Sequence, residues 1–221
     1  TIADPTAQAN RVNAEGTARL AQAAAAAGIG RFVYLSTIKV MGERSQTPFR
    51  ETDTPRPEDA YGKSKFAGEQ ALTETAQDSP LQPVILRAPL VYGPGVKANF
   101  LALMKLCQFA PPLPFAAVHN KRSIIYLGNL IDAICLCLTA EKAAGETYFV
   151  GDEEDLSTPA LIRHLAQALG RPARLFPAPG ALIRLAGAIT GKSDAISTLL
   201  SDLQVNNEKI HSQLGWTPPF N

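Results

Sequence analysis

Hydrophobic positions in the first part of the chain switch between helical and strand spacing. Residues 8–27 are rich in alanine, with Val12 and Leu20 at helical spacing and Gly28 where a helix would stop, so a helix is predicted there. The apolar run over 31–36 predicts a buried strand. A helix over 61–77 and a strand over 81–88 repeat this order. Helix, strand, helix and strand in sequence predict an α/β fold with a doubly wound parallel sheet.

The segment between the first strand and the second helix, residues 37–60, has a different composition. Gly42, Pro48, Pro55 and Pro57 stand there among charged residues, which predicts a long loop with at most a short turn. Long loops at the carboxyl ends of parallel strands tend to carry function. We therefore expect functional residues close to this loop.

Beyond residue 90 the chain is broken repeatedly by proline and glycine. The predicted helices cover 99–109, 130–138, 181–189 and 207–214, and a further helix starts at Ser157-Thr158-Pro159 and closes at Gly170. Strands are predicted over 122–127 and 147–150. We expect residues 91–221 to form a smaller α/β part, some of whose segments return to the sheet of residues 1–90.

Composition excludes several classes of partner. The 221 residues are 46% hydrophobic and carry 21 Lys plus Arg against 20 Asp plus Glu, a net charge of +1, so we expect a soluble globular protein with no nucleic-acid or membrane partner. No apolar run is long enough to span a bilayer. Cys107, Cys135 and Cys137 stand in apolar surroundings and are expected to be reduced core residues of a cytoplasmic protein. No metal site is expected, because neither these cysteines nor His119, His164 and His211 have ligand spacing.

Candidate chemistry lies at Tyr61-Gly62-Lys63-Ser64-Lys65. Residues four apart share a helix face, so the Lys65 ammonium is expected to lie near the Tyr61 phenol and favour its ionised form. A phenol titrates near ~10, and such a cation would make it usable as an acid or base. An exposed Tyr-Lys pair on an ordinary amphipathic helix is the alternative, because this pattern often arises by chance.

Five segments in order resemble one family. They are residues 12–17, 32–43, 61–65, 86–95 and 214–218. Together they are similar to the extended short-chain dehydrogenase/reductases, specifically the NAD-dependent epimerase/dehydratase group that acts on nucleotide sugars. The resemblance implies a partial Rossmann-like sheet in residues 1–90, with a catalytic threonine, tyrosine and lysine, and a mainly substrate-binding part in residues 91–221.

The resemblance also assigns roles to individual residues. Thr37 matches the strand-end hydroxyl that binds the reacting sugar oxygen, Tyr61 the acid/base, and Lys65 the lysine that also holds the nicotinamide ribose. The cofactor contacts implied are Ser36, Tyr61, Lys65, Ala88 and Pro89. Asn99 and Arg122 resemble residues that hold the substrate diphosphate, and Asn13 the asparagine that organises the backbone at the site. Thr37 as a simple cap, Arg122 as a solvated charge and Asn13 as a surface residue are the alternatives.

Two departures from the family pattern are visible. The glycine-rich G-x-x-G-x-x-G turn for the dinucleotide pyrophosphate is absent, so this chain alone is expected to bind cofactor weakly and to have apolar sheet edges. It opens at Thr1 without methionine, as if from the middle of a protein. Met41 replaces a tyrosine common in the family, which is expected to reshape the sugar pocket.

The function implied by the resemblance is that of a UDP-hexose, or UDP-N-acetylhexosamine, 4-epimerase that uses NAD, with NADP as the alternative. A second reading is an NAD(P)H-dependent reductase of a UDP-4-keto-6-deoxy sugar in polysaccharide biosynthesis. A dehydratase is less favoured, because Ile38 follows Thr37 where those enzymes tend to place an acidic pair. The reading from another class is a non-catalytic nucleotide-sugar-binding fragment. A homodimer is typical of relatives.

Overall fold

A parallel sheet forms the centre of the computed structural model, which describes residues 5–220. Its strands are β1 (Arg31–Thr37), β2 (Gln82–Ala88) and β5 (Thr147–Phe149), in the spatial order β1-β2-β5. β1 and β2 pair over their whole length, from Arg31 beside Gln82 to Thr37 beside Ala88. The expected α/β fold with a parallel sheet is therefore confirmed.

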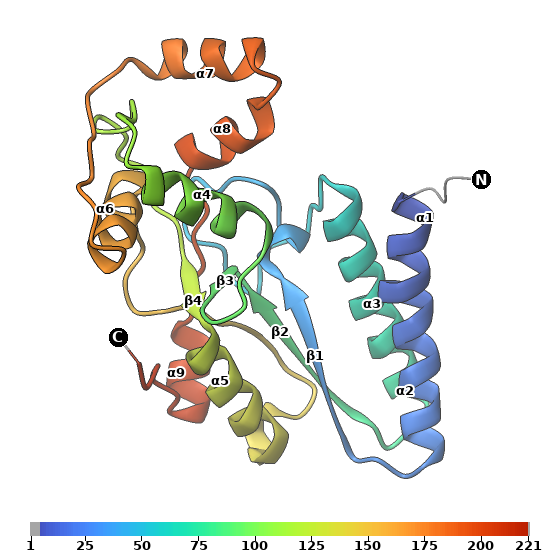
Figure 1. The fold of residues 1–221 in the computed structure, drawn as a ribbon. Helices are drawn as coiled ribbons and strands as arrows, with labels where there is room; N and C mark the ends of the chain where they lie inside the picture. The colour runs from blue at the N-terminus through green and yellow to red at the C-terminus, as the bar shows by residue number, and fades with distance from the viewer. Residues whose placement is uncertain (1–4, 221) are drawn as a thin grey trace.

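Helices cover both faces of this sheet (Figure 1). The helices α1 (Pro5–Asn10) and α2 (Gly16–Ala26) are joined through the π-helical turn η1 (Arg11–Glu15) and lie beside α3 (Ala60–Gln77). The other face packs against α5 (Leu127–Thr139) and α9 (Glu208–Leu214). Buried side chains on both faces fix the sheet between these two helical layers.

The predicted helix stop at Gly28 is present. Gly28 has a φ of +71°, and the amide of Ile29 donates to the carbonyl of Ala24 at 2.9 Å. This arrangement closes the helix end with a left-handed residue, which glycine adopts at no steric cost. The chain then turns directly into β1.

A second group of elements lies beyond the carboxyl end of β1 (Figure 1). It comprises α4 (Ala98–Phe109), α6 (Thr158–Ala168), α7 (Gly180–Ile189) and α8 (Ser193–Leu200), which share a core around Leu103, Phe115, Ile162 and Ile183. The short strands β3 (Leu90–Tyr92) and β4 (Ile124–Tyr126) pair with each other in parallel, and η3 (Glu141–Ala143) is a short 3₁₀ turn. β5 belongs to this half of the sequence but pairs with β2.

Several details differ from the sequence prediction. The expected strand over 122–127 is shorter, because Leu127 already begins α5 and Arg122 forms only isolated bridges with Leu156 and Leu203. β3 and α8 were not predicted, since β3 has three residues between Pro89 and Gly93, and α8 carries polar residues over two turns. Cys107 and Cys137 are buried as expected, but Cys135 is exposed on α5, so that part of the prediction was wrong.

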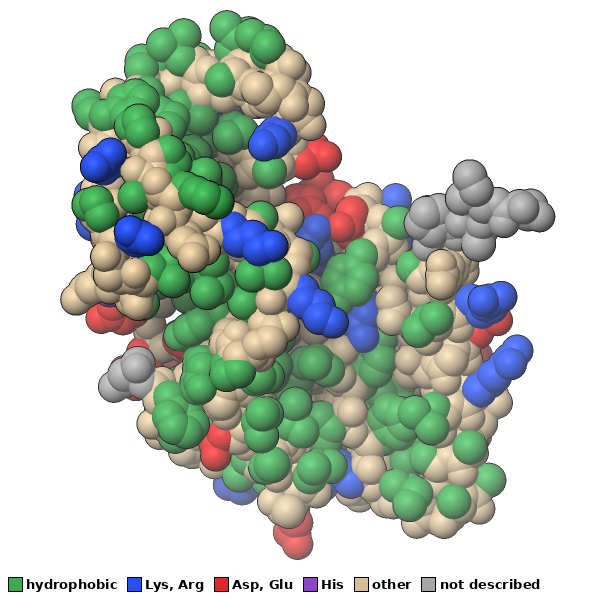
Figure 2. Space-filling model, viewed as in Figure 1, with side chains coloured by type: hydrophobic (Ala, Val, Ile, Leu, Met, Phe, Trp, Pro, Cys, Tyr) green, Lys and Arg blue, Asp and Glu red, His purple; other side chains and the backbone are tan. Residues whose placement is uncertain are grey.

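Hydrophobic side chains gather on the face of the molecule around β1 and α5 (Figure 2). Leu35, Ile131 and Leu138 are 41%, 51% and 49% exposed. In the part of the chain that the structure describes, β1 pairs with β2 and with no other strand. The sheet therefore has an open, partly apolar edge at β1.

Candidate active site

The carboxyl end of the sheet brings together residues from two strands. Thr37 ends β1 and stands beside Ala88, the last residue of β2, with Pro89 following. Because parallel strands present their carboxyl ends at one edge, Ser36, Thr37, Ala88 and Pro89 share a small region. All four are buried.

The hydroxyls of Ser36 and Thr37 have different environments. Thr37 Oγ1 accepts a hydrogen bond from the Lys39 amide at 3.3 Å and so caps the 3₁₀ turn η2 (Ile38–Val40). Ser36 Oγ is buried and has no hydrogen-bond partner among residues 5–220. A buried hydroxyl without a partner is uncommon, because it loses its bonds to water and gains none in return. The Ser36 hydroxyl is therefore available to a bound molecule.

The first turn of α3 places Tyr61 next to this region. Asp59 is the N-cap, with Oδ1 accepting from the Gly62 amide at 2.6 Å, as carboxylates at helix N-termini commonly do. Gly62 packs so closely on η2 that an added Cβ would lie 2.6 Å from the Lys39 carbonyl oxygen. Tyr61 itself is 47% exposed. The helix start is thus in direct contact with η2, the turn that follows the end of β1.

Lys39 links the same two segments by charge. Its Nζ lies 2.7 Å from Asp59 Oδ2 and 2.9 Å from Glu43 Oε1. Burial alone would lower the pKa of Lys39, but the hydrogen bonds to Asp59 and Glu43 raise it above its ordinary value. Burial would likewise raise the pKa of Asp59, and the hydrogen bonds from Lys39 and Gly62 instead hold it below the usual range.

The expected effect of Lys65 on Tyr61 is not what the structure shows. Partial burial and the Asp59 carboxylate raise the pKa of the Tyr61 phenol, and the cation that opposes them is Lys39. Lys65 Nζ instead lies over the Tyr34 ring, 4.0 Å from its centroid. The prediction that Lys65 makes the phenol acidic was therefore wrong, because the lysine side chain folds back onto β1.

Lys65 is nevertheless an unusual lysine. Burial lowers its pKa to about 8, against a weaker opposing effect of Glu69, and it forms no ion pair within the described part of the chain. Its neighbour Tyr34 has a pKa raised to about 12 by burial. A desolvated ammonium without a carboxylate partner can donate to hydroxyl groups of a ligand.

Asn13 connects the helices behind the site. Its Nδ2 donates to Ser64 Oγ at 3.0 Å, and its carbonyl accepts from Tyr34 Oη at 3.3 Å. Gly68 must lack a side chain here, since a Cβ would lie 2.3 Å from both the Asn13 carbonyl oxygen and Tyr34 Oη. Asn13 therefore has structural bonds to α3 and β1, unlike a plain surface residue.

The two predicted diphosphate contacts come from the second part of the molecule. Asn99 is exposed in the first turn of α4. Arg122 Nη1 donates to the carbonyls of Thr198 at 2.8 Å and Ser201 at 3.1 Å, at the end of α8, and burial lowers the pKa of its guanidinium. No hydrogen bond or ion pair within residues 5–220 joins Asn99 or Arg122 to Thr37 or Tyr61, so their joint role stays a prediction.

A buried ion pair near the site was not anticipated. Arg87 Nε and Nη2 donate to the two carboxylate oxygens of Glu69 at 3.0 and 2.6 Å, and Arg87 Nη1 donates to Met41 Sδ at 3.2 Å. Met41 is buried in the core, so the expectation that it reshapes an open sugar pocket is not supported by its packing. The sequence signal available was a charged residue inside the apolar strand β2.

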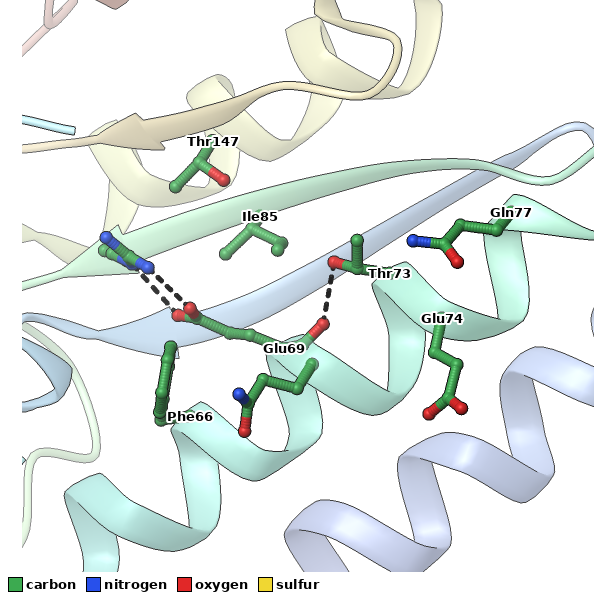
Figure 3. A pocket seen from close by; sticks show the side chains of 9 residues that line it. Phe66, Glu69, Thr73, Glu74, Gln77, Ile85 and Thr147 are labelled. Atoms are coloured by element: carbon green, nitrogen blue, oxygen red, sulfur yellow. Dashed lines mark hydrogen bonds and ion pairs between the residues drawn. The ribbon is translucent and has the colours of Figure 1, made fainter. Parts of the chain in front are cut away.

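A groove of about 540 Å³ lies beside this ion pair, between α3 and strands β2 and β5 (Figure 3). Glu69, Thr73 and Gln77 line it from α3, and Ile85 and Thr147 from the sheet. None of the predicted site residues lines it. We therefore place the candidate site at Thr37 and Tyr61, where strand ends and helix start converge, and not in this groove.

Within residues 5–220 there is no group of three or more His, Cys, Asp or Glu side chains that could hold a metal ion. His119 and His164 are exposed, and His211 packs against the Trp216 ring. Among the described helices, none combines the length and apolar character required to cross a membrane.

The residues present suit one half of a nicotinamide dinucleotide. Among residues 5–220, the buried Ser36 hydroxyl has no hydrogen-bond partner and the Lys65 ammonium has no ion pair, and both are groups that can bind the nicotinamide ribose. The printed sequence has no glycine-rich turn for the pyrophosphate. The fit therefore concerns the nicotinamide end alone.

Comparison with known proteins decides the family. The NAD dependent epimerase/dehydratase family model matches residues 1–151. The chain belongs to this family. Because the family consists of NAD-dependent enzymes, the predictions of an enzyme and of NAD as cofactor are confirmed.

Individual relatives agree with this assignment. The chain is 42% identical over 220 residues to the UDP-glucose 4-epimerase of Vibrio cholerae, covering 98% of this chain and 67% of the relative. It is 27% identical over 230 residues to the N-acetyl-alpha-D-glucosaminyl-diphospho-ditrans,octacis-undecaprenol 4-epimerase of Escherichia coli O157:H7, covering 98% of this chain and 69% of that protein.

A solved structure shows the same fold. The UDP-glucuronic acid 4-epimerase of Bacillus cereus in complex with NAD superposes with a TM-score of 0.74 at 23% identity, covering 95% of this chain and 63% of that one. The present chain spans about two thirds of the length of these three relatives.

Proposed function

We propose that this chain forms the catalytic and substrate-binding part of a nucleotide-sugar epimerase that inverts carbon 4 of a UDP-hexose or its N-acetylated form. The observation that carries the proposal is the 42% identity to the UDP-glucose 4-epimerase of Vibrio cholerae over 98% of the chain. The aligned region covers 98% of the chain, so it spans both the sheet part and the second part of the molecule.

The proposed reaction moves one proton and one hydride. During oxidation the 4-hydroxyl proton passes to the Tyr61 oxygen, and the hydrogen on carbon 4 leaves as hydride. After the ketosugar rotates, the hydride returns to the opposite face of carbon 4 and Tyr61 returns the proton to the sugar oxygen. The bound nicotinamide supplies the hydride acceptor and a positive charge. Thr37 binds the reacting sugar oxygen, and Lys65 with Ser36 holds the nicotinamide ribose.

Tyr61 suits this role by its position more than by its own pKa. Its phenol is half-exposed at the edge where Thr37 ends β1, within the turn held by Asp59 and Gly62. Its raised pKa means that it is protonated at neutral pH. The positive charge of a bound nicotinamide would favour the ionised form that accepts the proton.

The test is conversion of UDP-glucose to UDP-galactose, and of UDP-N-acetylglucosamine to its epimer, by the protein that carries this chain in the presence of NAD. Tyr61→Phe and Thr37→Ala should each lower kcat by roughly 100-fold or more. Thr54→Ala, in the exposed loop before α3, is the matched control and should retain full rate.

A different outcome would redirect the assignment. Failure of both epimerisations together with NADH or NADPH oxidation by a UDP-4-keto-6-deoxy sugar would show a reductase. Failure of all these reactions, with equal UDP-sugar binding by wild type and Tyr61→Phe, would show a binding module with no turnover.

A further inference from the structure

Lys39 has no role in the proposed mechanism, although it lies within residues 32–43, one of the five segments that resemble the family. It lies in η2, directly after Thr37, and its side chain crosses to the N-terminus of α3. Its ammonium contacts two carboxylates, Asp59 at 2.7 Å and Glu43 at 2.9 Å. Asp59 in turn caps the helix turn that carries Tyr61.

The same contact region is fixed by the backbone. Gly62 lies against the Lys39 carbonyl with no room for a side chain, and the Arg56 amide donates to the Val40 carbonyl at 3.0 Å. The segment that presents Thr37 and the segment that presents Tyr61 therefore meet at Lys39 through main chain and side chain alike. Charged side chains of both signs are visible in the hollow between the two parts of the molecule (Figure 2).

We propose that Lys39 is a positioning residue for Tyr61: it holds the first turn of α3 against the end of β1 and supplies the positive charge that acts on the phenol. A contribution of Lys39 to catalysis rests on the proposed function, whereas the effect of Lys39 on the Tyr61 phenol does not. Lys65, which lies over Tyr34, does not supply this charge.

The charges around Tyr61 support an electrostatic role. Burial and the Asp59 carboxylate both raise the pKa of Tyr61, and the Lys39 ammonium lowers it. Tyr34 on β1 interacts electrostatically with the Tyr61 phenol, and the Lys65 ammonium lies over the Tyr34 ring. Glu43 affects this group of charges through its ion pair with Lys39. Removing Lys39 would leave Asp59 and Glu43 as uncompensated negative charges on that side.

The experiment is titration of the Tyr61 phenol, followed by near-ultraviolet absorbance. For each variant, the curve of the same protein carrying Tyr61→Phe is subtracted, so that the remaining signal belongs to Tyr61. Lys39→Gln should raise the Tyr61 midpoint by roughly 0.5–1 pH unit, a threefold to tenfold drop in the ionised fraction at a fixed pH below it. Lys39→Arg should restore the wild-type midpoint. Ion pairs this exposed contribute little to stability, so both variants should fold.

Asp59→Asn separates an electrostatic role from a merely structural one. Asparagine still caps the helix but carries no charge, so the Tyr61 midpoint should fall, opposite to the effect of Lys39→Gln. Loosening of the turn alone would move both variants in the same direction and would overturn the proposal. So would an unchanged midpoint in Lys39→Gln, or failure of Lys39→Arg to restore it.

The enzyme assay distinguishes this inference from the proposed function. If epimerisation is found, the pH at which kcat/KM rises should shift upward in Lys39→Gln and return in Lys39→Arg. If no epimerisation is found but the two titrations move as expected, the proposed function fails and the positioning role stands. If epimerisation is found but the Tyr61 midpoint does not move in the variants, the proposed function stands and the positioning role of Lys39 fails.

Discussion

At the scale of single residues, Tyr61 and Lys65 occupy successive turns of α3 but have different surroundings. Tyr61 is half-exposed near Asp59 and Lys39, whereas the Lys65 ammonium is packed on the Tyr34 ring and forms no ion pair among residues 5–220. A lysine that is charged in such a place destabilises the folded state, and side chains retained at that cost are commonly functional. Lys65 is therefore a candidate for function on physical grounds as well as by its family motif.

Lys65→Met should stabilise the protein while removing activity. At about pH 7 the lysine holds its proton in both folded and unfolded chains. The pKa lowered to about 8 means that this charge destabilises the folded state, by roughly 1–2 kcal/mol after allowance for the solvent screening of a partly exposed group. Between that pKa and the ordinary lysine value, the unfolded chain binds more protons than the folded one, so wild-type stability rises with pH. The advantage of Lys65→Met in urea unfolding should thus shrink from about pH 7 to about pH 10.

Lys63→Met is the matched control for this experiment. Lys63 lies two residues before Lys65 on the same helix, and its side chain is exposed. Its replacement should change stability by less than about 0.5 kcal/mol at both pH values. A Lys65→Met protein that is less stable than wild type at neutral pH would contradict the argument.

At the scale of elements, the active-site geometry depends on how α3 begins. The N-cap Asp59, the close approach of Gly62 to Lys39 and the turn η2 together fix the angle at which the helix leaves the sheet edge. Close packing of a helix start on a strand end leaves no space for relaxation, so small changes in volume are felt directly. Tyr61 is one residue from this contact.

Gly62→Ala should therefore destabilise the protein, although alanine normally favours a helix over glycine by roughly 1 kcal/mol. The new Cβ would lie 2.6 Å from the Lys39 carbonyl oxygen, and relief of the clash must move η2 or the helix. We expect a net loss of about 1–3 kcal/mol in urea unfolding, with a fall in kcat if the proposed function holds. Gly30→Ala is the control, because no atom lies within 4 Å of its added Cβ, and it should be neutral or slightly stabilising. A stabilising Gly62→Ala would show that this contact is loose.

At the scale of the whole molecule, the candidate residues come from both of its parts. Thr37, Tyr61 and Lys65 belong to the sheet and its helix, whereas Asn99 and Arg122 belong to the group formed around α4 and α8. A nucleotide sugar held by all of them would bridge the two parts. Its binding should raise the stability of the molecule by mass action.

UDP should raise the Tm of the protein, and Asn99→Ala should reduce this shift without changing the Tm of the free protein. Asn99 is exposed and makes no side-chain hydrogen bond within residues 5–220, so its removal leaves packing intact. At a UDP concentration 100 times its Kd, the ligand contributes roughly 2.7 kcal/mol, which thermal unfolding detects readily. Asn10→Ala, on the exposed side of α1, should keep the full shift. Equal shifts in both variants would remove Asn99 from the proposed diphosphate contacts.

Most of the fold was predictable because local signals agree with it. Gly28 and Gly170 stop helices with left-handed residues, Ser157 caps α6, and the apolar runs of β1 and β2 fill both faces of a covered sheet. β3 and α8 escaped prediction because three residues between proline and glycine, or eight with mixed polarity, carry too little pattern. Cys135 is exposed because it lies on the side of α5 that faces away from the sheet. The spacing of hydrophobic residues in this helix did not show which side would be buried.

The sequence by itself determined the family, the order of elements and the candidate set, because motifs and periodicity are properties of neighbouring residues. Only the tertiary structure decided the electrostatics. Arg87 contacts Glu69 and Met41, which are 18 and 46 residues away in the sequence. The Lys65 side chain folds back over Tyr34, so Lys39 is the cation that acts on Tyr61. Charge effects fall off with distance in space and depend on local burial, and neither quantity is written in residue spacing.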